Sequence, residues 1–202
     1  MSEQIGRDMY FFTADLHFGE EEIIARESRP FGNMKEMEDA FVNNVNKVAS
    51  VEDTLYVLGD WINYNFLYQS DISIFGIVKR LAPQVILIMG NNEQRLLKDV
   101  FNGDLEAMRK AVTGMGFKDL LTEADVEFGG ETFHLIHQPV DHKEGCMNLF
   151  GHTHRGTGLW KSFGLNVGID MNYFRPFSET EILRLLKAKR EWMDNDPNVL
   201  CR

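Results

Sequence analysis

The sequence predicts a single-domain α/β fold with mixed β-sheets, and three observations support this. Short apolar runs typical of buried strands recur along the chain, and segments with helical spacing lie between them. The second half is richer in strand patterns, so a mixed arrangement is favoured over a purely parallel sheet. The 202 residues suit one domain with a sizeable core.

Six apolar runs indicate strands. Most of them lack a clean alternation of apolar and polar residues, which is typical of strands covered on both faces. The six runs cover residues 9–13, 54–58, 85–89, 132–136, 147–150 and 165–169.

Five segments have helical spacing. The first carries apolar residues at positions 34, 37, 41, 45 and 48, and Asn33 with Glu36 forms a capping-box signature at its start. Ser178 and Glu181 form the same signature before the last helix, which carries apolar residues from 182 to 186. The other three segments cover residues 72–81, 93–101 and 105–112.

The composition narrows the possible functions. The net charge of −10 argues against a protein that coats nucleic acid or an anionic membrane. No apolar run approaches the roughly 20 residues of a membrane span, and the N-terminus lacks the pattern of a signal peptide. Two cysteines do not suggest a disulfide framework, so we expect a cytoplasmic protein. Its oligomeric state stays open.

Side chains of the kinds that bind metal ions directly follow five of the predicted strands. Because ligands of open α/β sheets bind outside the carboxyl ends of strands, these side chains are expected at one edge. In the two Asp/His-x-His segments, alternate residues of an extended chain point the same way. The candidate ligands are Asp15, His17, Asp60, Asn91, His137, His152 and His154.

This set of donors favours two divalent ions. Carboxylate, imidazole and amide donors without a thiolate suit manganese, iron, zinc, cobalt or nickel, with manganese as the first choice. Seven donors are too many for one tetrahedral ion and suit two ions that share a carboxylate. Gly59, Gly90 and Gly151 each precede a candidate ligand, where glycine allows a sharp turn.

In order along the chain, the motifs DLH, GD, GNNE, the strand-end His137 and GHTH resemble those of the calcineurin-like metallophosphoesterases. The stretches RPFGNMKEM, DTLYVLGD and NVGIDMNYFRPFSE further resemble a small bacterial and phage branch of that family. The likeness runs from about residue 9 to about residue 187. Each motif is short, but five in order at strand ends are specific.

The resemblance implies a four-layer αββα sandwich, which we expect as one domain over residues 1–202. It also implies that Asp15, His17 and His154 hold one ion, that Asn91, His137 and His152 hold the other, and that Asp60 bridges them. A water or hydroxide between the ions would attack the phosphorus of a phosphate ester in line. The substrate would be a small phosphorylated molecule or a nucleotide.

Asn92 departs from the family pattern. Family members usually have histidine at this position, near the substrate phosphate, where it protonates the leaving oxygen or stabilises the transition state. Asparagine cannot transfer a proton but can donate a hydrogen bond. General acid catalysis contributes about 10²–10⁴-fold, so the change should weaken the enzyme without removing its metal chemistry. Asn92 therefore favours a phosphodiesterase, and the alternative is a weakly active or inactive metal-binding scaffold that docks a protein partner.

Several other polar residues have two interpretations. Arg155 follows the last ligand and could contact a substrate phosphate or be a surface charge, and Arg26 and Arg29 carry the same ambiguity. His142 could replace the missing acid or lie in a surface loop. His134 differs in parity from His137 along its strand, so we expect a structural role for it.

Overall fold

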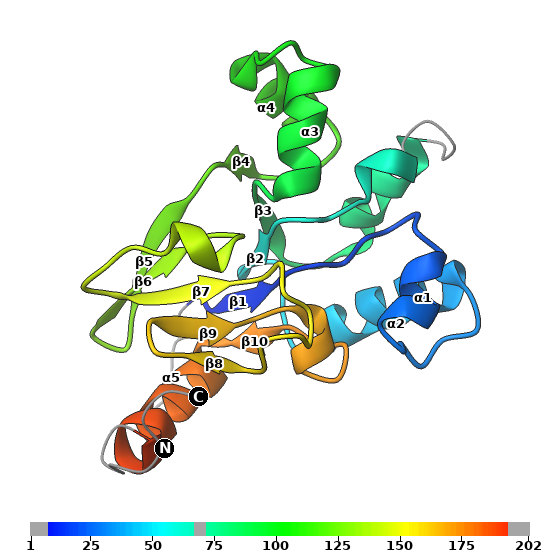
Figure 1. The fold of residues 1–202 in the computed structure, drawn as a ribbon. Helices are drawn as coiled ribbons and strands as arrows, with labels where there is room; N and C mark the ends of the chain where they lie inside the picture. Colours follow the sequence, from blue (N-terminus) through cyan, green and yellow to red (C-terminus); the bar gives the residue numbers. More distant parts are fainter. Residues whose placement is uncertain (1–7, 67–71, 194–202) are drawn as a thin grey trace.

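The computed structural model describes residues 8–66 and 72–193 (Figure 1). Within these ranges the chain folds into two five-stranded mixed sheets that pack face to face, with helices around them. The α/β class and the mixed sheets expected from the sequence are thus confirmed. No helix in the described ranges is long and apolar enough to cross a membrane.

The first sheet has the strand order β10-β1-β2-β3-β4. Strands β1 to β4 are parallel, and β10 pairs antiparallel with β1. The central strands are buried on both faces, which explains their uninterrupted apolar runs. The strands are β1 (Tyr10–Thr13), β2 (Thr54–Leu58), β3 (Gln84–Ile88), β4 (Asp119–Leu121) and β10 (Phe177–Ser178).

The second sheet has the order β5-β6-β7-β9-β8. Strands β6, β7 and β9 are parallel to one another, and each edge strand pairs antiparallel with its neighbour. The strands are β5 (Ala124–Phe128), β6 (Glu131–Leu135), β7 (Met147–Phe150), β8 (Trp160–Lys161) and β9 (Gly164–Asn166).

Two apolar cores lie on the two faces of the first sheet, because successive strand residues point to opposite sides. Phe11 packs with helices on the outer face, whereas Phe12 packs between the sheets with residues such as Phe133 and Leu149. The outer layer contains α1 (Glu22–Arg26), α2 (Met34–Asn46), η2 (Ile72–Arg80), α3 (Asn91–Asp99) and α4 (Leu105–Gly114). Helix α5 (Glu179–Ala188) joins the inner core through Ile182 and Leu186.

Most predicted elements are present within a few residues of their expected ends. The side chain of Asn33 caps α2, and Ser178 with Glu181 forms the expected capping box of α5. The segment expected to be helical at 72–81 is the 3-10 helix η2, and the strand expected at 165–169 ends at Asn166. Strands β4, β5, β8 and β10 were not predicted, because two are only two residues long and two are partly exposed.

The remaining short helices lie in connections. They are η1 (Tyr64–Phe66), η3 (Pro139–Asp141), η4 (Ile169–Met171) and the π-helical η5 (Lys189–Met193). Three parallel strands of the first sheet and two of the second end at the same edge of the sandwich. Gly151, which follows β7, lies close to the first sheet there, because a Cβ at this position would lie 2.5 Å from Ala14 Cβ.

Candidate metal centre

All seven candidate ligands meet at this edge through a continuous series of close approaches. Asn91 Oδ1 lies 2.9 Å from His137 Nε2 and 3.0 Å from His152 Nδ1. The backbone N–H of His152 donates to Asp15 Oδ1 over 2.9 Å. The rings of His17 and His154 stack with centroids 5.0 Å apart. The structure therefore brings together the seven side chains that the strand-end pattern singled out, and their role as metal ligands stays a prediction.

Asp60 lies between two halves of the cluster. Its Oδ2 is 3.5 Å from His17 Nε2, and its Oδ1 is 3.6 Å from His137 Nε2. Ligand atoms of Asp15, His17 and His154 lie within 4.8 Å of one another, as do those of Asp15, Asp60 and His137. Each half of the cluster could therefore hold a cation, with Asp60 facing both.

Five of the seven residues adopt a left-handed backbone. The φ angles are 61° at Asp15, 53° at His17, 53° at Asp60, 69° at His152 and 45° at His154. Few non-glycine residues adopt this conformation, and such strain is concentrated at functional sites. The two ligand pairs are thus aimed by left-handed turns and not by the extended backbone expected from their spacing. Leu16, between the first pair, is fully buried in the outer core.

Two glycines are required by close packing under the ligands. A Cβ at Gly59 would lie 2.5 Å from His137 Nδ1, and φ there is +83°. A Cβ at Gly90 would lie 2.4 Å from Asp60 Oδ1. Any larger residue at either position would displace a candidate ligand.

Three polar atoms in the cluster are buried and have no hydrogen-bond partner among the described residues. They are Asp15 Oδ2 and the two ring nitrogens of His17, of which Nδ1 lies 3.2 Å from Glu20 Oε2. Nearly all buried polar atoms in proteins are satisfied, so such atoms require an explanation. A carboxylate oxygen and an imidazole nitrogen are both electron-pair donors, and a cation between them would satisfy both. The residues therefore fit a metal ion.

Glu93 organises the loops that carry the cluster. Its carboxylate accepts backbone N–H bonds from Asp60, Trp61 and Gly90 at 2.8 to 3.0 Å. Burial raises the pKa of Glu93, and the nearby charge of Asp60 raises it further, to about 7. Glu93 thus ties the loop after β2 to the start of α3.

Asp170 supports the cluster from the other side. Its Oδ2 is 3.0 Å from His154 Nδ1, and both carboxylate oxygens accept hydrogen bonds from Arg29 at 2.9 Å. Burial by itself would raise the pKa of Asp170, but the bonds to His154 and Arg29 outweigh it and lower the pKa to about 2. Because Nδ1 of His154 is occupied, its Nε2 is the nitrogen available to a metal ion.

Arg29 is a structural residue, which resolves one ambiguity in the sequence. Besides its pair with Asp170, it donates to the backbone carbonyls of Asp15 and Leu16 at 2.6 and 2.8 Å. One buried guanidinium therefore holds both the loop after β1 and the partner of His154. Arg26 instead pairs with Glu20, whose Oε2 lies 3.2 Å from His17 Nδ1.

The other residues singled out from the sequence are Asn92, Arg155 and His142, and they do not all lie at the cluster. Asn92 is buried beside the cluster: its N–H donates to Asp60 Oδ1, and its side-chain carbonyl accepts from Tyr64 N. Arg155 is exposed and lines a cavity beside Asp170. His142 is not brought to the cluster, because its loop folds over the second sheet and its ring stacks on Phe163 at 4.0 Å.

Glu20, Glu93 and Asp170 were not identified from the sequence. Asp170 directly follows the predicted strand 165–169, so the strand-end rule could have included it. Glu93 lies three residues after Gly90, the N-cap of α3, which is the capping-box position. His134 has the structural role expected for it, with Nδ1 2.6 Å from Asp125 Oδ1 on β5.

Comparisons with known proteins agree with this geometry. The profile of the calcineurin-like phosphoesterases matches residues 10–179. An uncharacterized protein of Methanocaldococcus jannaschii is 25% identical over 187 residues, covering 88% of this chain and 90% of that protein. A solved structure of a protein of unknown function from Aquifex aeolicus shares 25% identity and a TM-score of 0.64, covering 89% of this chain and 100% of that one. A solved archaeal phosphodiesterase matches with 15% identity and a TM-score of 0.42, over 79% of this chain and 82% of that one.

Proposed function

The chain belongs to the calcineurin-like phosphoesterase family, and from this premise we propose that it is a phosphodiesterase with two divalent metal ions. The single observation that carries the proposal is the position of Asp60 between His17 and His137, at 3.5 and 3.6 Å. One carboxylate that faces two imidazoles, each in its own cluster of donors, suits two ions better than one.

The proposed ligands follow from the contacts. Asp15, His17 and His154 are proposed for one ion, and Asn91, His137 and His152 for the other, with Asp60 between them. Such ions, when bound, stabilise charge on phosphoryl oxygens and lower the pKa of water. The protein holds the donors in place through Glu93, Asp170 and the carbonyl of Leu58, which lies 2.8 Å from His137 Nδ1.

The preference for diesters rests on Asn92. Its side-chain carbonyl is used by the N–H of Tyr64, so its remaining polar group is the amide NH₂. That group can donate a hydrogen bond to a phosphoryl oxygen but cannot protonate a leaving group. Substrates whose leaving group needs little protonation should therefore react best. We include manganese and a cytoplasmic location in the proposal, on the donor chemistry and the low cysteine content.

The test combines metal analysis with two matched substrates. Protein purified with Mn²⁺ should contain close to two ions per chain and should hydrolyse bis(p-nitrophenyl) phosphate faster than p-nitrophenyl phosphate. Asn92→His should raise the rate with an alkyl phosphodiester, whose alkoxide leaving group needs a proton, relative to the rate with bis(p-nitrophenyl) phosphate by about 10²-fold, because it restores a proton donor.

Each outcome has a distinct meaning. At most one ion per chain would contradict the binuclear centre. A strong preference for the monoester in the parent protein would contradict the interpretation of Asn92. Two bound ions without turnover of either ester would favour the second candidate function, a metal-binding scaffold. The asparagine at position 92, where family members usually have histidine, also supports that function.

A further inference from the structure

A cavity of about 580 Å³ lies beside the proposed metal centre. Its lining includes Arg155, Asp170, Tyr173 and Phe174. Its volume falls within the range of about 300–1,000 Å³ typical of small-molecule sites. The proposed phosphodiesterase function assigns no role to Arg155, Tyr173 or Phe174, which line this cavity.

Two of the residues that line the cavity are neighbours of His154, one of the candidate ligands. Asp170 lines it and is also the partner of His154 Nδ1, at 3.0 Å. Arg155 lines it and directly follows His154 in the chain. A molecule whose phosphate is held beside Arg155 would therefore have its organic group next to this cavity.

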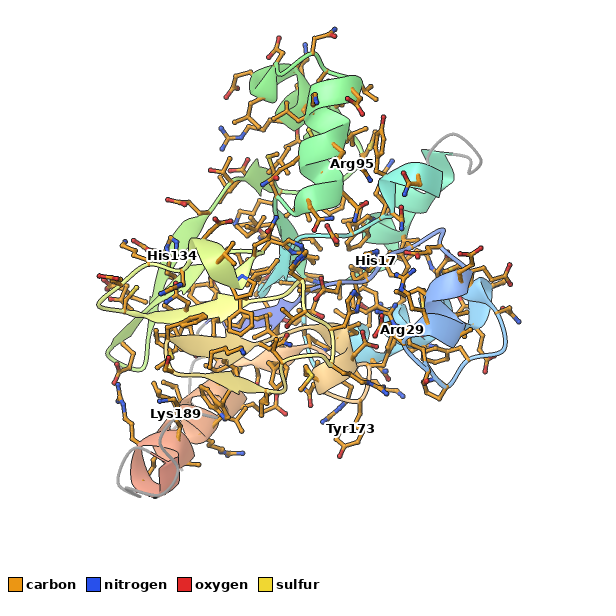
Figure 2. The ribbon with its side chains drawn as sticks, in the orientation of Figure 1. His17, Arg29, Arg95, His134, Tyr173 and Lys189 are labelled. Carbon is orange, nitrogen blue, oxygen red and sulfur yellow. The ribbon has the colours of Figure 1, made fainter. Side chains whose placement is uncertain are left out.

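Tyr173 is unusual among the apolar and aromatic side chains of the described residues. It is 90% exposed, whereas the other exposed large hydrophobic residues there are all valines. Its φ is +51° and that of Phe174 is +61°, so two successive residues are left-handed. In Figure 2 its side chain projects outward from the segment after η4. A strained backbone that keeps an aromatic ring in solvent points to a ligand that covers the ring.

The backbone that presents Tyr173 is anchored. The ring of Phe174 packs edge-on against Phe31 with centroids 4.6 Å apart, and the Arg29 guanidinium carbon lies 5.4 Å from the centre of that ring. The carbonyl of Phe174 accepts a hydrogen bond of 2.8 Å from Asn44 Nδ2. These contacts therefore hold the backbone next to Tyr173 in place beside the cavity.

Arg155 is the cation in this cavity that is available to a ligand. Arg29, which also lines it, is committed to Asp170 and to two backbone carbonyls. The guanidinium of Arg155 makes no hydrogen bond or ion pair with any residue in the described ranges and is exposed. A free guanidinium suits a phosphate oxygen, whereas a phenol ring suits the face of another ring.

We propose that this cavity is a nucleoside subsite, in which Tyr173 stacks on the base of a nucleoside phosphodiester and Arg155 contacts its phosphate. The inference rests on the phosphodiesterase function proposed above and names its substrate class. A free aromatic face, a free guanidinium and an adjacent metal centre match the base, phosphate and scissile bond of such a molecule. Base–aromatic stacking is sequence-tolerant, so the subsite accepts any of the common bases.

The test uses two diesters with the same leaving group. Thymidine 5′-(p-nitrophenyl phosphate) carries a base, and methyl p-nitrophenyl phosphate does not. For the manganese-loaded protein, kcat/KM should be at least about 10-fold higher for the thymidine ester. Tyr173→Ala should bring this ratio close to one, whereas Tyr173→Phe should keep it. Val140→Ala, at an exposed site in η3, serves as the control and should keep the parent ratio.

Binding gives a second readout. Tyr173→Ala should also lower the ratio between the inhibition constants of inorganic phosphate and thymidine 5′-monophosphate, since only the nucleotide has a base. Equal kcat/KM for the two diesters in the parent protein would overturn the nucleoside subsite while leaving the phosphodiesterase function intact. Failure to hydrolyse either diester would instead overturn the proposed function.

Discussion

Two buried histidines of this protein, His17 and His134, differ in how their polar atoms are satisfied. The residues are 5% and 4% exposed, and each lies near carboxylates. His134 is paired with Asp125, which in turn accepts from Lys143 at 2.6 Å. Neither ring nitrogen of His17 has a hydrogen-bond partner in the part of the chain that the structure describes, and Nε2 faces Asp60. Figure 2 shows the two in separate parts of the molecule, His134 on the second sheet and His17 in the loop after β1.

The difference separates a structural histidine from a candidate ligand. Burial does not distinguish them, and neither does a neighbouring carboxylate. What distinguishes them is the balance of donors and acceptors. The His134 group contains an acid, an imidazole and an ammonium, and is complete. The His17 group contains several acids and imidazoles around unsatisfied ring nitrogens, and a cation would complete it.

The largest effect is expected when the carboxylate beside each histidine is removed and metal-dependent activity is measured. Asp60→Ala should lower metal-dependent phosphodiester hydrolysis by at least about 10³-fold, because Asp60 faces both proposed ions. Asp125→Ala is the matched control, since it removes the carboxylate beside His134, and it should keep both ions and activity. Metal analysis and kinetics on both proteins check this, and an active Asp60→Ala protein would show that the site lies elsewhere.

A smaller effect is expected from the support behind a ligand. Asp170→Asn should weaken metal binding by about 10–100-fold, because a carboxylate behind a metal-bound histidine fixes its orientation and basicity. Arg29 also loses its buried ionic partner, so the melting temperature should fall. Metal titration distinguishes the two roles: a lower melting temperature with unchanged metal affinity would mean that Asp170 only supports the fold.

The smallest effect is expected at the satisfied histidine. His134→Gln should cost about 1 kcal/mol of unfolding free energy, since it exchanges one side-chain hydrogen bond to Asp125 for a weaker one. Metal content and kcat/KM should stay at the parent values. Denaturant unfolding checks the stability, and loss of a bound ion in this variant would refute the division between the two groups.

Much of the fold and of the site followed from local patterns. The apolar runs located six strands, and the caps at Asn33 and Ser178 located the starts of α2 and α5. Strands β4 and β5 were missed because β4 has three residues and β5 alternates buried and exposed side chains. A short or half-exposed strand has little apolar signal of its own, and its partner strand decides whether it forms.

By itself, the sequence determined which polar residues meet at the candidate metal centre, because parallel strands bring their carboxyl ends to one edge and seven candidate donors follow such ends. Only the tertiary structure decided how these donors are held. Asp170 and Arg29 pair although they are 141 positions apart, and five of the candidate ligands adopt left-handed backbone conformations. It also decided that Tyr173 stays exposed beside this centre. Long-range pairing and backbone strain depend on the packing of distant segments, and no local pattern of residues records them.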